Sequence, residues 1–215
     1  METKTNVLIV EDQAMPRQLF ETIVEGIEGL RLSLSIDNAE IADICAKRQD
    51  IGLVIMDVVT KGGASGLLAA ERIKKENPKI KIIIATSMLE CSYIERAKKI
   101  GVEGFWYKDF GEEPFASVIK RVMAGEIVYP KKKPEVTLGL AKGSDLTKRE
   151  LEILRKMTGG YTNAEIASLE GLSEKRVRNV VASMLEKTGF RNRTELAVRA
   201  RESGIVILER NSEDI

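Results

Sequence analysis

Short apolar runs alternate with amphipathic segments along the first 125 residues. Residues 6–10, 52–56, 81–85 and 104–107 are mostly apolar, which is typical of strands buried on both faces of a parallel sheet. Residues 30–36 alternate apolar and polar side chains and predict a strand nearer an edge. The intervening pattern predicts helices over 14–25, 37–47, 67–75, 89–100 and 113–123, the second opened by a capping box of Asp37 and Glu40. Five strands alternating with five helices indicate an α/β fold with a doubly wound, five-stranded parallel sheet.

The pattern changes beyond residue 125. Residues 129–134 read Tyr-Pro-Lys-Lys-Lys-Pro, and two prolines without an apolar period predict a semi-rigid linker. The signals after it are helical only: Thr147 with Glu150, Thr162 with Glu165 and Asn192 with Glu195 resemble capping boxes, and Ser173 can cap a further helix. We therefore expect a domain over 1–125, a linker over 126–143 and a small all-α domain of four helices over 144–215.

The composition is that of an ordinary globular protein, and it excludes several kinds of site. The 215 residues include no histidine, which rules out a Ser-His-Asp or Cys-His nucleophile and a zinc site with histidine ligands. Two cysteines make no disulfide framework, and no apolar run approaches the ~20 residues of a membrane span, so we expect a cytoplasmic protein without a membrane partner. Residues 1–129 carry a net charge of −3 and the remainder +4, so the second part is the better candidate for binding nucleic acid.

Three carboxylates are predicted to meet at one edge of the sheet. Glu11 and Asp12 follow the first strand, and Asp57 ends the third. Ligand sites of open α/β folds form at the carboxyl ends of strands, and two unit charges ~4 Å apart interact by about 4 kcal/mol at an effective dielectric of about 20. Three ionised acids therefore need a cation, and Mg²⁺ is the ion that prefers one or two carboxylates together with water. The alternative is that one or more of these acids is only a solvated loop residue.

Two further residues extend this candidate site. Thr86 ends the fourth strand and Lys108 follows the fifth, so both are expected at the same edge of the sheet. A hydroxyl and an ammonium beside a metal-bound carboxylate form a set that can bind a phosphoryl group. In such a set Asp57 would be the attacking nucleophile.

Residues 5–124 resemble the receiver domain of two-component response regulators. The resemblance is carried by Glu11-Asp12, Asp57, Thr86-Ser87 and Phe105-Trp106-Tyr107-Lys108. It implies a flavodoxin-like fold in which Asp57 accepts a phosphoryl group from the phosphohistidine of a sensor histidine kinase. It also implies that Mg²⁺ binds Asp12, Asp57 and the carbonyl of Val59, with Glu11 acting through water.

The same resemblance implies a switch. Lys108 and Thr86 would bind the phosphoryl oxygens, and Phe105 would be the aromatic residue that turns inward as the Thr86 hydroxyl moves toward the phosphate. Phosphorylation adds about −1.5 to −2 charge at the acceptor, and this change would favour either a homodimer or release of the basic domain.

The loop after Asp57 differs from the family pattern. Residues 58–66 read Val-Val-Thr-Lys-Gly-Gly-Ala-Ser-Gly, which lacks the usual proline and is one residue longer. Its glycines permit unusual backbone angles at a cost in order. Val59 and Met88, two residues beyond Asp57 and Thr86, are apolar and cannot orient an attacking water. By analogy with the family, we expect the phosphorylated form to last for hours rather than minutes.

The second domain resembles the LuxR/NarL-type helix-turn-helix over residues 146–205. The matching segments are Leu146-Thr147-Lys148-Arg149-Glu150, Thr162-Asn163-Ala164-Glu165-Ile166-Ala167, Leu172-Ser173-Glu174-Lys175-Arg176-Val177-Arg178 and Arg193-Thr194-Glu195. A helix from Ser173 to Lys187 would be about 22 Å long, enough to lie in a major groove. Its apolar stripe consists of Val177, Val181, Met184 and Leu185, which leaves Lys175, Arg176, Arg178, Asn179 and Ala182 facing outward.

The resemblance assigns base reading to Arg178, Asn179 and Ala182. It assigns contacts near the DNA backbone to Thr162, Asn163, Lys175, Lys187 and Arg193. Arg176 stands where the family usually has threonine, Val180 where it often has histidine and Ala164 where a lysine is common, so the preferred DNA sequence is expected to differ. The alternative is that these charges only form a solvated helix face.

We therefore predict a phosphorylation-controlled transcription regulator rather than an enzyme, with a sensor histidine kinase and promoter DNA as partners and a homodimer as the phosphorylated form. Two alternatives stay open. A Mg²⁺-dependent phosphohydrolase with Asp57 as nucleophile would need a second acid, typically where Val59 stands. A constitutive DNA-binding protein whose receiver works unphosphorylated is supported only by the unusual loop after Asp57.

Overall fold

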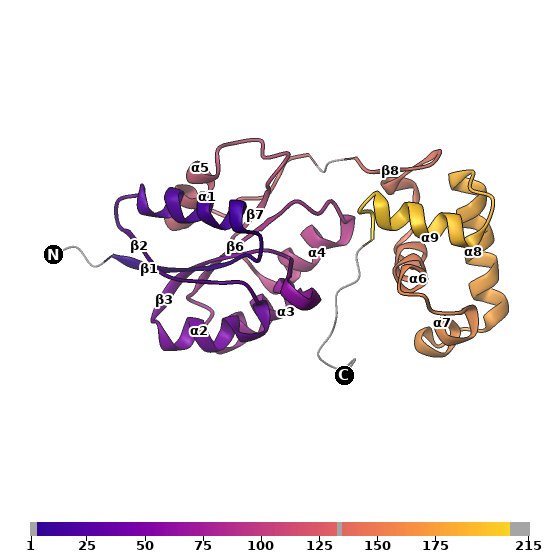
Figure 1. Cartoon of the computed structure of the whole chain (residues 1–215), viewed down its shortest axis with the longest axis horizontal. Helices are drawn as coiled ribbons and strands as arrows, with labels where there is room; N and C mark the ends of the chain where they lie inside the picture. Colours follow the sequence, from indigo (N-terminus) through magenta and orange to yellow (C-terminus); the bar gives the residue numbers. More distant parts are fainter. Residues whose placement is uncertain (1–3, 133–134, 207–215) are drawn as a thin grey trace. The chain divides into compact units, whose positions relative to one another are not determined.

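The computed structural model describes residues 4–132 and 135–206, and these fold as two compact units (Figure 1). The first unit comprises residues 4–88 and 92–132, and the second contains residues 135–206. Lys133 and Pro134, which belong to the predicted linker, lie outside the described residues. None of the helices in the described ranges combines the length and the apolar character that a membrane span requires.

The first unit is built on one parallel sheet. Its elements are β1 (Thr5–Val10), α1 (Ala14–Glu25), β2 (Leu30–Ile36), the 3-10 helix η1 (Ala39–Ile41), α2 (Ala42–Arg48), β3 (Ile51–Met56), β4 (Val59–Thr60), the 3-10 helix η2 (Lys61–Gly63), β5 (Ala64–Ser65), α3 (Gly66–Glu76), β6 (Lys81–Thr86), α4 (Cys91–Ile100), β7 (Gly104–Tyr107) and α5 (Phe115–Met123). Strands β2, β1, β3, β6 and β7 pair in that order, and every pair is parallel. The predicted doubly wound sheet is confirmed.

Helices cover both faces of this sheet. Helices α1 and α5 lie on one side, where Phe20 and Val118 belong to the same buried core as Val7 and Ile9 of β1, and α2 and α3 lie on the other side (Figure 1). Because both faces are covered, the four residues from Val7 to Val10 are all 0% exposed. The apolar runs therefore form strands, and each strand delivers its last residue to the same edge of the sheet.

The start of the second helix was predicted wrongly. The side chain of Asn38, not that of Asp37, accepts the backbone N–H of Glu40 at 2.7 Å and opens η1. Asp37 is instead paired with Lys61, whose ammonium lies 2.8 Å from Oδ2 and whose backbone N–H donates to the Asp37 carbonyl at 3.1 Å. The loop after Asp57 thus extends to the β2–α2 turn, a contact that local pattern could not reveal.

The second unit contains four helices in its described part, as predicted. Its elements are β8 (Thr137–Leu138), β9 (Ala141–Lys142), the 3-10 helix η3 (Gly143–Asp145), α6 (Lys148–Thr158), α7 (Asn163–Glu170), α8 (Glu174–Thr188) and α9 (Arg193–Glu202). The antiparallel pair of β8 and β9 was not predicted and lies within the segment predicted to be a linker. The capping boxes of α6 and α7 are complete. At α9 the Asn192 side chain accepts the N–H of Glu195 at 2.9 Å, but the Glu195 side chain accepts from Arg191, at 3.0 Å, and not from Asn192.

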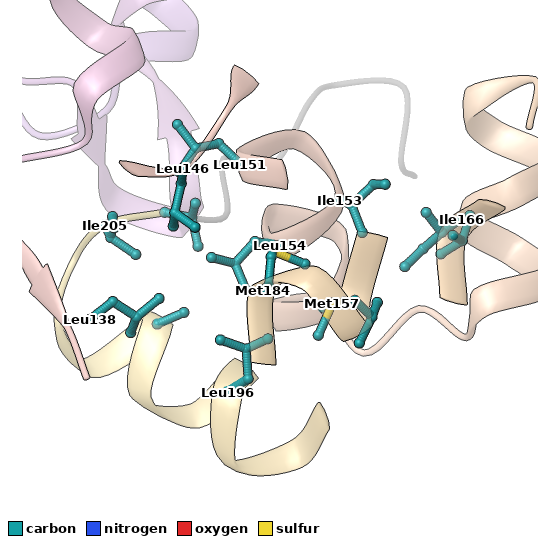
Figure 2. Close-up of a cluster of buried hydrophobic side chains, with 14 of the residues drawn as sticks. Leu138, Leu146, Leu151, Ile153, Leu154, Met157, Ile166, Met184, Leu196 and Ile205 are labelled. Carbon is teal, nitrogen blue, oxygen red and sulfur yellow. The ribbon is translucent and has the colours of Figure 1, made fainter. Parts of the chain in front are cut away.

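One apolar core holds these helices together (Figure 2). It joins the hairpin, the four helices and the segment after α9, through residues that include Leu138, Leu146, Leu154, Met157, Ile166, Met184, Leu196 and Ile205 (Figure 2). Val177 and Val181 belong to the same core, so the predicted apolar stripe of α8 is its buried side. Packing on that side fixes which side chains of α8 face solvent.

Candidate functional site

The sheet places Asp57 directly beside the end of the first strand. The backbone N–H of Asp57 donates to the carbonyl of Val10 at 2.9 Å, and Val10 pairs with Met56. A side chain at Gly66 would be excluded, because a Cβ there would lie 1.8 Å from the Asp57 carbonyl oxygen. Gly66 therefore allows the start of α3 to approach the end of β3, a role that only the structure reveals.

The three predicted carboxylates come together. Carboxylate oxygens of Glu11, Asp12 and Asp57 all lie within 4.8 Å of one another. Glu11 and Asp57 are buried, and Asp12 is exposed. Two oxygens on opposite sides of a Mg²⁺ ion are about 4.2 Å apart at its usual bond length. The all-oxygen cluster therefore fits a small hard cation after minor side-chain adjustment or with one carboxylate acting through water.

Lys108 lies inside this acidic cluster. Its ammonium is 2.5 Å from Oε2 of Glu11 and 2.7 Å from Oδ2 of Asp57. Burial raises the pKa of Glu11, and the charge of Asp57 raises it further, while Lys108 opposes both effects. Burial also raises the pKa of Asp57 against the opposing effect of Lys108. Burial would lower the pKa of Lys108, but the two carboxylates outweigh burial and raise the pKa above its ordinary value.

The remaining predicted pocket residues take three different places. Thr86 is fully buried, its hydroxyl accepts the backbone N–H of Met88 at 3.2 Å, and its carbonyl accepts the backbone N–H of Lys108 at 2.9 Å. Phe105 is also buried, but its ring packs against Tyr107 and Tyr129. Val59 lies in β4, two residues beyond Asp57. Thr86 thus lies close enough to the central acid to lower the pKa of Asp57, and Phe105 contacts other aromatic rings.

The unusual loop is a small clamped hairpin. Strands β4 and β5 pair antiparallel, and Gly62 and Gly63 between them have positive φ angles of 76° and 82°. Buried Thr60 accepts the N–H of Ala39 at 2.9 Å and donates to the carbonyl of Ala64 at 3.3 Å. Together with the Lys61–Asp37 pair, these bonds compensate for the conformational freedom that two glycines introduce.

Helix α8 presents the predicted polar face. Lys175, Arg176, Arg178, Asn179 and Ala182 are all exposed, and Thr162 is exposed at the start of α7. Ser173 accepts the N–H of Arg176 at 3.2 Å and caps α8. Lys175, Arg176 and Asn179 also line an open hollow of about 520 Å³. A cationic, exposed helix face of this kind suits a polyanionic partner.

Three other residues of the predicted interface make bonds within the unit. Arg193 donates to the Asn163 side chain and to the Tyr161 carbonyl, so it links the start of α9 to the start of α7. The ammonium of Lys187 lies 2.8 Å from Oε2 of Glu150 and 2.9 Å from the Asp145 carbonyl. Each of these side chains therefore already has a structural role.

Glu150 is the structural residue that sequence reasoning underestimated. It was predicted only as a helix cap, but it is buried and also accepts from Ser183 at 3.0 Å and from Lys187. Burial opposes its ionisation, but hydrogen bonds from Lys187, Thr147 and Ser183 outweigh burial and hold the pKa of Glu150 below its ordinary value. Glu150 thus connects the start of α6 to the middle and end of α8.

Comparison with known proteins assigns the chain to a protein family. Residues 7–120 match the family of response regulator receiver domains, and residues 144–200 match the luxR family of bacterial regulatory proteins. The chain belongs to the two-component response regulators. It is 34% identical over 209 residues to the transcriptional regulatory protein DesR of Bacillus subtilis, with 93% of this chain and 98% of DesR covered. The response regulator VraR of Staphylococcus aureus is 30% identical over 162 residues, covering 72% of this chain and 76% of VraR.

Solved structures show the same architecture. A complex of the response regulator RcsB with DNA matches at a TM-score of 0.60 and 19% identity, covering 91% of this chain and 97% of RcsB. A LuxR-family response regulator from Aurantimonas matches at a TM-score of 0.54, covering 61% of this chain. As a response regulator with a LuxR-type DNA-binding domain, the chain is a transcription regulator and not an enzyme, and its partners are a sensor kinase and DNA.

Proposed function

We propose that this response regulator accepts a phosphoryl group on Asp57 from the phosphohistidine of a sensor histidine kinase, and that phosphorylation shifts its dimerisation and its binding of promoter DNA. The observation that carries the proposal is the contact of Lys108 with a buried carboxylate at the end of the central strand, with the buried Thr86 beside it. Both groups are donors that can bind phosphoryl oxygens. We also propose the division into a receiver over 1–125, a linker over 126–143 and a DNA-binding domain over 144–215.

In the proposed transfer an Asp57 carboxylate oxygen attacks phosphorus, and the P–N bond to the kinase imidazole breaks. The attack needs an ionised and oriented carboxylate. The N–H of Val58 donates to Oδ1 at 2.6 Å, and Lys108 holds Oδ2. The neutral imidazole is released once it has gained a proton from solvent. Lys108 and Thr86 then donate to the new phosphoryl oxygens. The packing of Phe105 changes when Thr86 moves.

The acidic cluster supports a divalent cation in this reaction. Mg²⁺ held by Asp12, Asp57 and the Val59 carbonyl, with Glu11 through water, would supply positive charge to the phosphoryl oxygens. Lys108 already shares its single charge between Glu11 and Asp57, which leaves Asp12 for the cation. The apolar side chain of Val59 supplies no acid for a leaving group, which is a further argument against a phosphohydrolase.

For DNA binding, we propose that Arg178, Asn179 and Ala182 of α8 read base edges. Arginine can bind guanine and asparagine adenine through paired hydrogen bonds, each worth about 1–3 kcal/mol of discrimination. Thr162, Lys175 and Arg176 are exposed and would contact phosphates. Asn163, Lys187 and Arg193 would reach phosphates only from the positions that their internal bonds allow. Promoter DNA as target implies action in the cytoplasm.

A symmetric dimer fits this proposal. The RcsB structures include two dimers bound to two parallel DNA molecules. Two recognition helices related by a two-fold axis would reach half-sites about one helical turn of DNA apart.

The test compares wild type with Asp57→Ala before and after treatment with acetyl phosphate. Sedimentation measures dimerisation, and titration of a duplex selected from a random library measures DNA affinity. We expect a phosphate-dependent gain in wild type and none in Asp57→Ala, with both proteins folded. Glu28→Ala, an exposed acid in the turn between α1 and β2, is the matched control and should behave as wild type. Equal gain in Asp57→Ala would refute the proposal.

A further inference from the structure

The chain leaves the first unit along the strand that carries Lys108. Strand β7 lies at one edge of the sheet and is followed directly by Lys108. The segment after α5 runs parallel to this edge, with Val128 opposite Gly104. The N–H of Phe105 donates to the Val128 carbonyl at 2.9 Å, and the N–H of Val128 donates to the Glu103 carbonyl at 2.8 Å. Backbone hydrogen bonds on both sides of Gly104 thus fix the exit segment on β7.

Tyr129 adds a side-chain latch to this pairing. Its ring is stacked on that of Phe105, with centroids 6.3 Å apart and planes 21° from parallel. Its hydroxyl donates to the carbonyl of Val102 at 3.0 Å, and the Lys98 ammonium lies 5.2 Å from its ring centroid. Burial raises the pKa of Tyr129, and Glu103 raises it further, so the hydroxyl stays a donor at physiological pH.

Pro130, the residue after Tyr129, limits the path of the chain that follows. Pro130 has a fixed φ near −65° and restricts the backbone of Tyr129 before it, so a given orientation of Tyr129 leaves few directions for the chain that follows. Beyond Pro130, the N–H of Lys132 donates to Oε1 of Glu112 at 2.8 Å, and both of these residues are exposed. Tyr129 is therefore the last aromatic anchor of the exit segment in the described part of the first unit.

The acidic cluster and this anchor share one short element. Lys108 binds Asp57 and Glu11, and Phe105, which stacks on Tyr129, is three residues earlier on the strand, about 10 Å away. A paired strand moves as a unit, so a change in the position of Lys108 reaches the partners of β7. On the side of β7 away from β6, this partner is the exit segment.

We propose that Tyr129 is a positioning residue that couples the acidic cluster to the direction in which the chain leaves the first unit. The inference rests on the proposed phosphorylation of Asp57. A phosphoryl group on Asp57 draws Lys108 to new oxygens, β7 and Phe105 adjust, and the stacked Tyr129 transmits this adjustment to Pro130. Without the Tyr129 ring, the backbone pairing of the exit segment with β7 opens more readily, and the segment no longer follows Phe105.

The test uses the full chain as wild type, Tyr129→Ala and Tyr129→Phe, each with and without acetyl phosphate. The phosphorylated fraction is measured first, on a gel that retards phosphoprotein, and DNA affinity is then measured on the selected duplex. Allosteric coupling typically changes affinity about 5- to 150-fold, so we expect phosphorylation to raise the DNA affinity of wild type about fivefold or more. In Tyr129→Ala the ratio of DNA affinities with and without phosphorylation should fall below about twofold at an equal phosphorylated fraction, because the coupling through the ring is lost. A merely structural role of Tyr129 would leave that ratio unchanged. Tyr129→Phe keeps the stacking and should retain most of the ratio.

Hydrogen exchange at the amides of Phe105 and Val128 gives a second readout. Both amides should exchange faster in Tyr129→Ala than in wild type, and neither should change in the control Glu28→Ala. A wild-type ratio in Tyr129→Ala, or unchanged protection of both amides, would overturn the inference. Failure of wild type to take up phosphate would refute the proposed function instead, and exchange in the unphosphorylated proteins would still decide whether Tyr129 anchors the exit segment.

Discussion

The ammonium of Lys108 lies 2.7 Å from Oδ2 of Asp57, although 51 residues separate them in the chain. Strand β6 lies between their two strands in the sheet, so Lys108 reaches Asp57 past the end of β6, where Thr86 stands. The same ammonium also binds Glu11 at 2.5 Å. One positive charge therefore serves two buried carboxylates, with Asp12 beside them, and without a metal the cluster keeps an excess of negative charge.

This excess charge predicts that Asp57→Asn stabilises the metal-free protein. The substitution removes a buried carboxylate whose ionised form is disfavoured by burial, while Lys108 keeps Glu11 as partner, so we expect a higher unfolding free energy than in wild type. The pKa of folded Asp57 is raised above 3.8, so its ionised form is disfavoured by folding, and that penalty disappears on acidification. The advantage of Asn should thus be full above the raised pKa, shrink as pH falls through it and be absent below 3.8.

Urea unfolding with a chelator across this pH range measures the difference in unfolding free energy. Glu28→Gln, an exposed substitution of the same type, should show no such pH-dependent gain. A less stable Asp57→Asn protein at neutral pH would show that Lys108 more than compensates for the burial of Asp57.

Gly66→Ala is expected to disrupt the site through a backbone clash. The new Cβ would lie 1.8 Å from the carbonyl oxygen of Asp57 and 2.9 Å from Cγ of Met56, and the carbonyl cannot rotate away as a side chain could. We expect a loss of about 3 kcal/mol or more in unfolding free energy. Gly62→Ala is the matched control in the same loop, because it meets no atom within 4 Å and carries only a positive φ of 76°. That strain should cost about 1–2 kcal/mol. Denaturant midpoints of the two variants measure the difference, and equal losses would contradict the close approach of α3.

The phosphorylated form is predicted to decay slowly. Val59 is apolar and half-buried, so its side chain cannot orient a water toward the phosphorus. Val59→Asn places an amide there and should shorten the lifetime of the acyl phosphate several-fold, measured by loss of the gel-retarded species after removal of acetyl phosphate. Val59→Ala separates the two possible causes, since it removes bulk without adding a polar group. Equal acceleration in both variants would assign the slow decay to shielding from water instead.

The local sequence pattern predicted the main helices and strands because their apolar and polar residues recur with a regular period. The predicted bounds of 14–25 and 30–36 agree with α1 and β2, and the buried runs became the central strands. The carboxylates could be placed together because the carboxyl ends of neighbouring parallel strands share an edge. The hairpin after Asp57 escaped prediction, since it depends on Thr60 meeting Ala39, 21 residues away.

The proposed DNA-binding residues likewise include features that the sequence predicted and features that it did not. The exposed face of α8 followed from its apolar stripe, as the burial of Val177 and Val181 confirms. The internal bonds of Lys187 and Arg193 did not follow, because a long basic side chain looks alike in sequence whether it faces DNA or a buried carboxylate. Glu150 explains the difference, since its burial becomes visible only once α6 and α8 are packed together.

This difference predicts opposite behaviour for two lysines of the interface. Lys187→Ala leaves buried Glu150 with one donor fewer and should lower the unfolding free energy of the helical unit by about 1–3 kcal/mol. Lys175→Ala, at an exposed position, should change that free energy by less than about 0.5 kcal/mol. It should instead weaken binding to every duplex alike and reduce the slope of log affinity against log salt by about 1. Urea unfolding and salt-dependent DNA titration of both variants provide the comparison. A Lys187→Ala protein of wild-type stability with a reduced salt slope would show that Lys187 contacts phosphate rather than supporting Glu150.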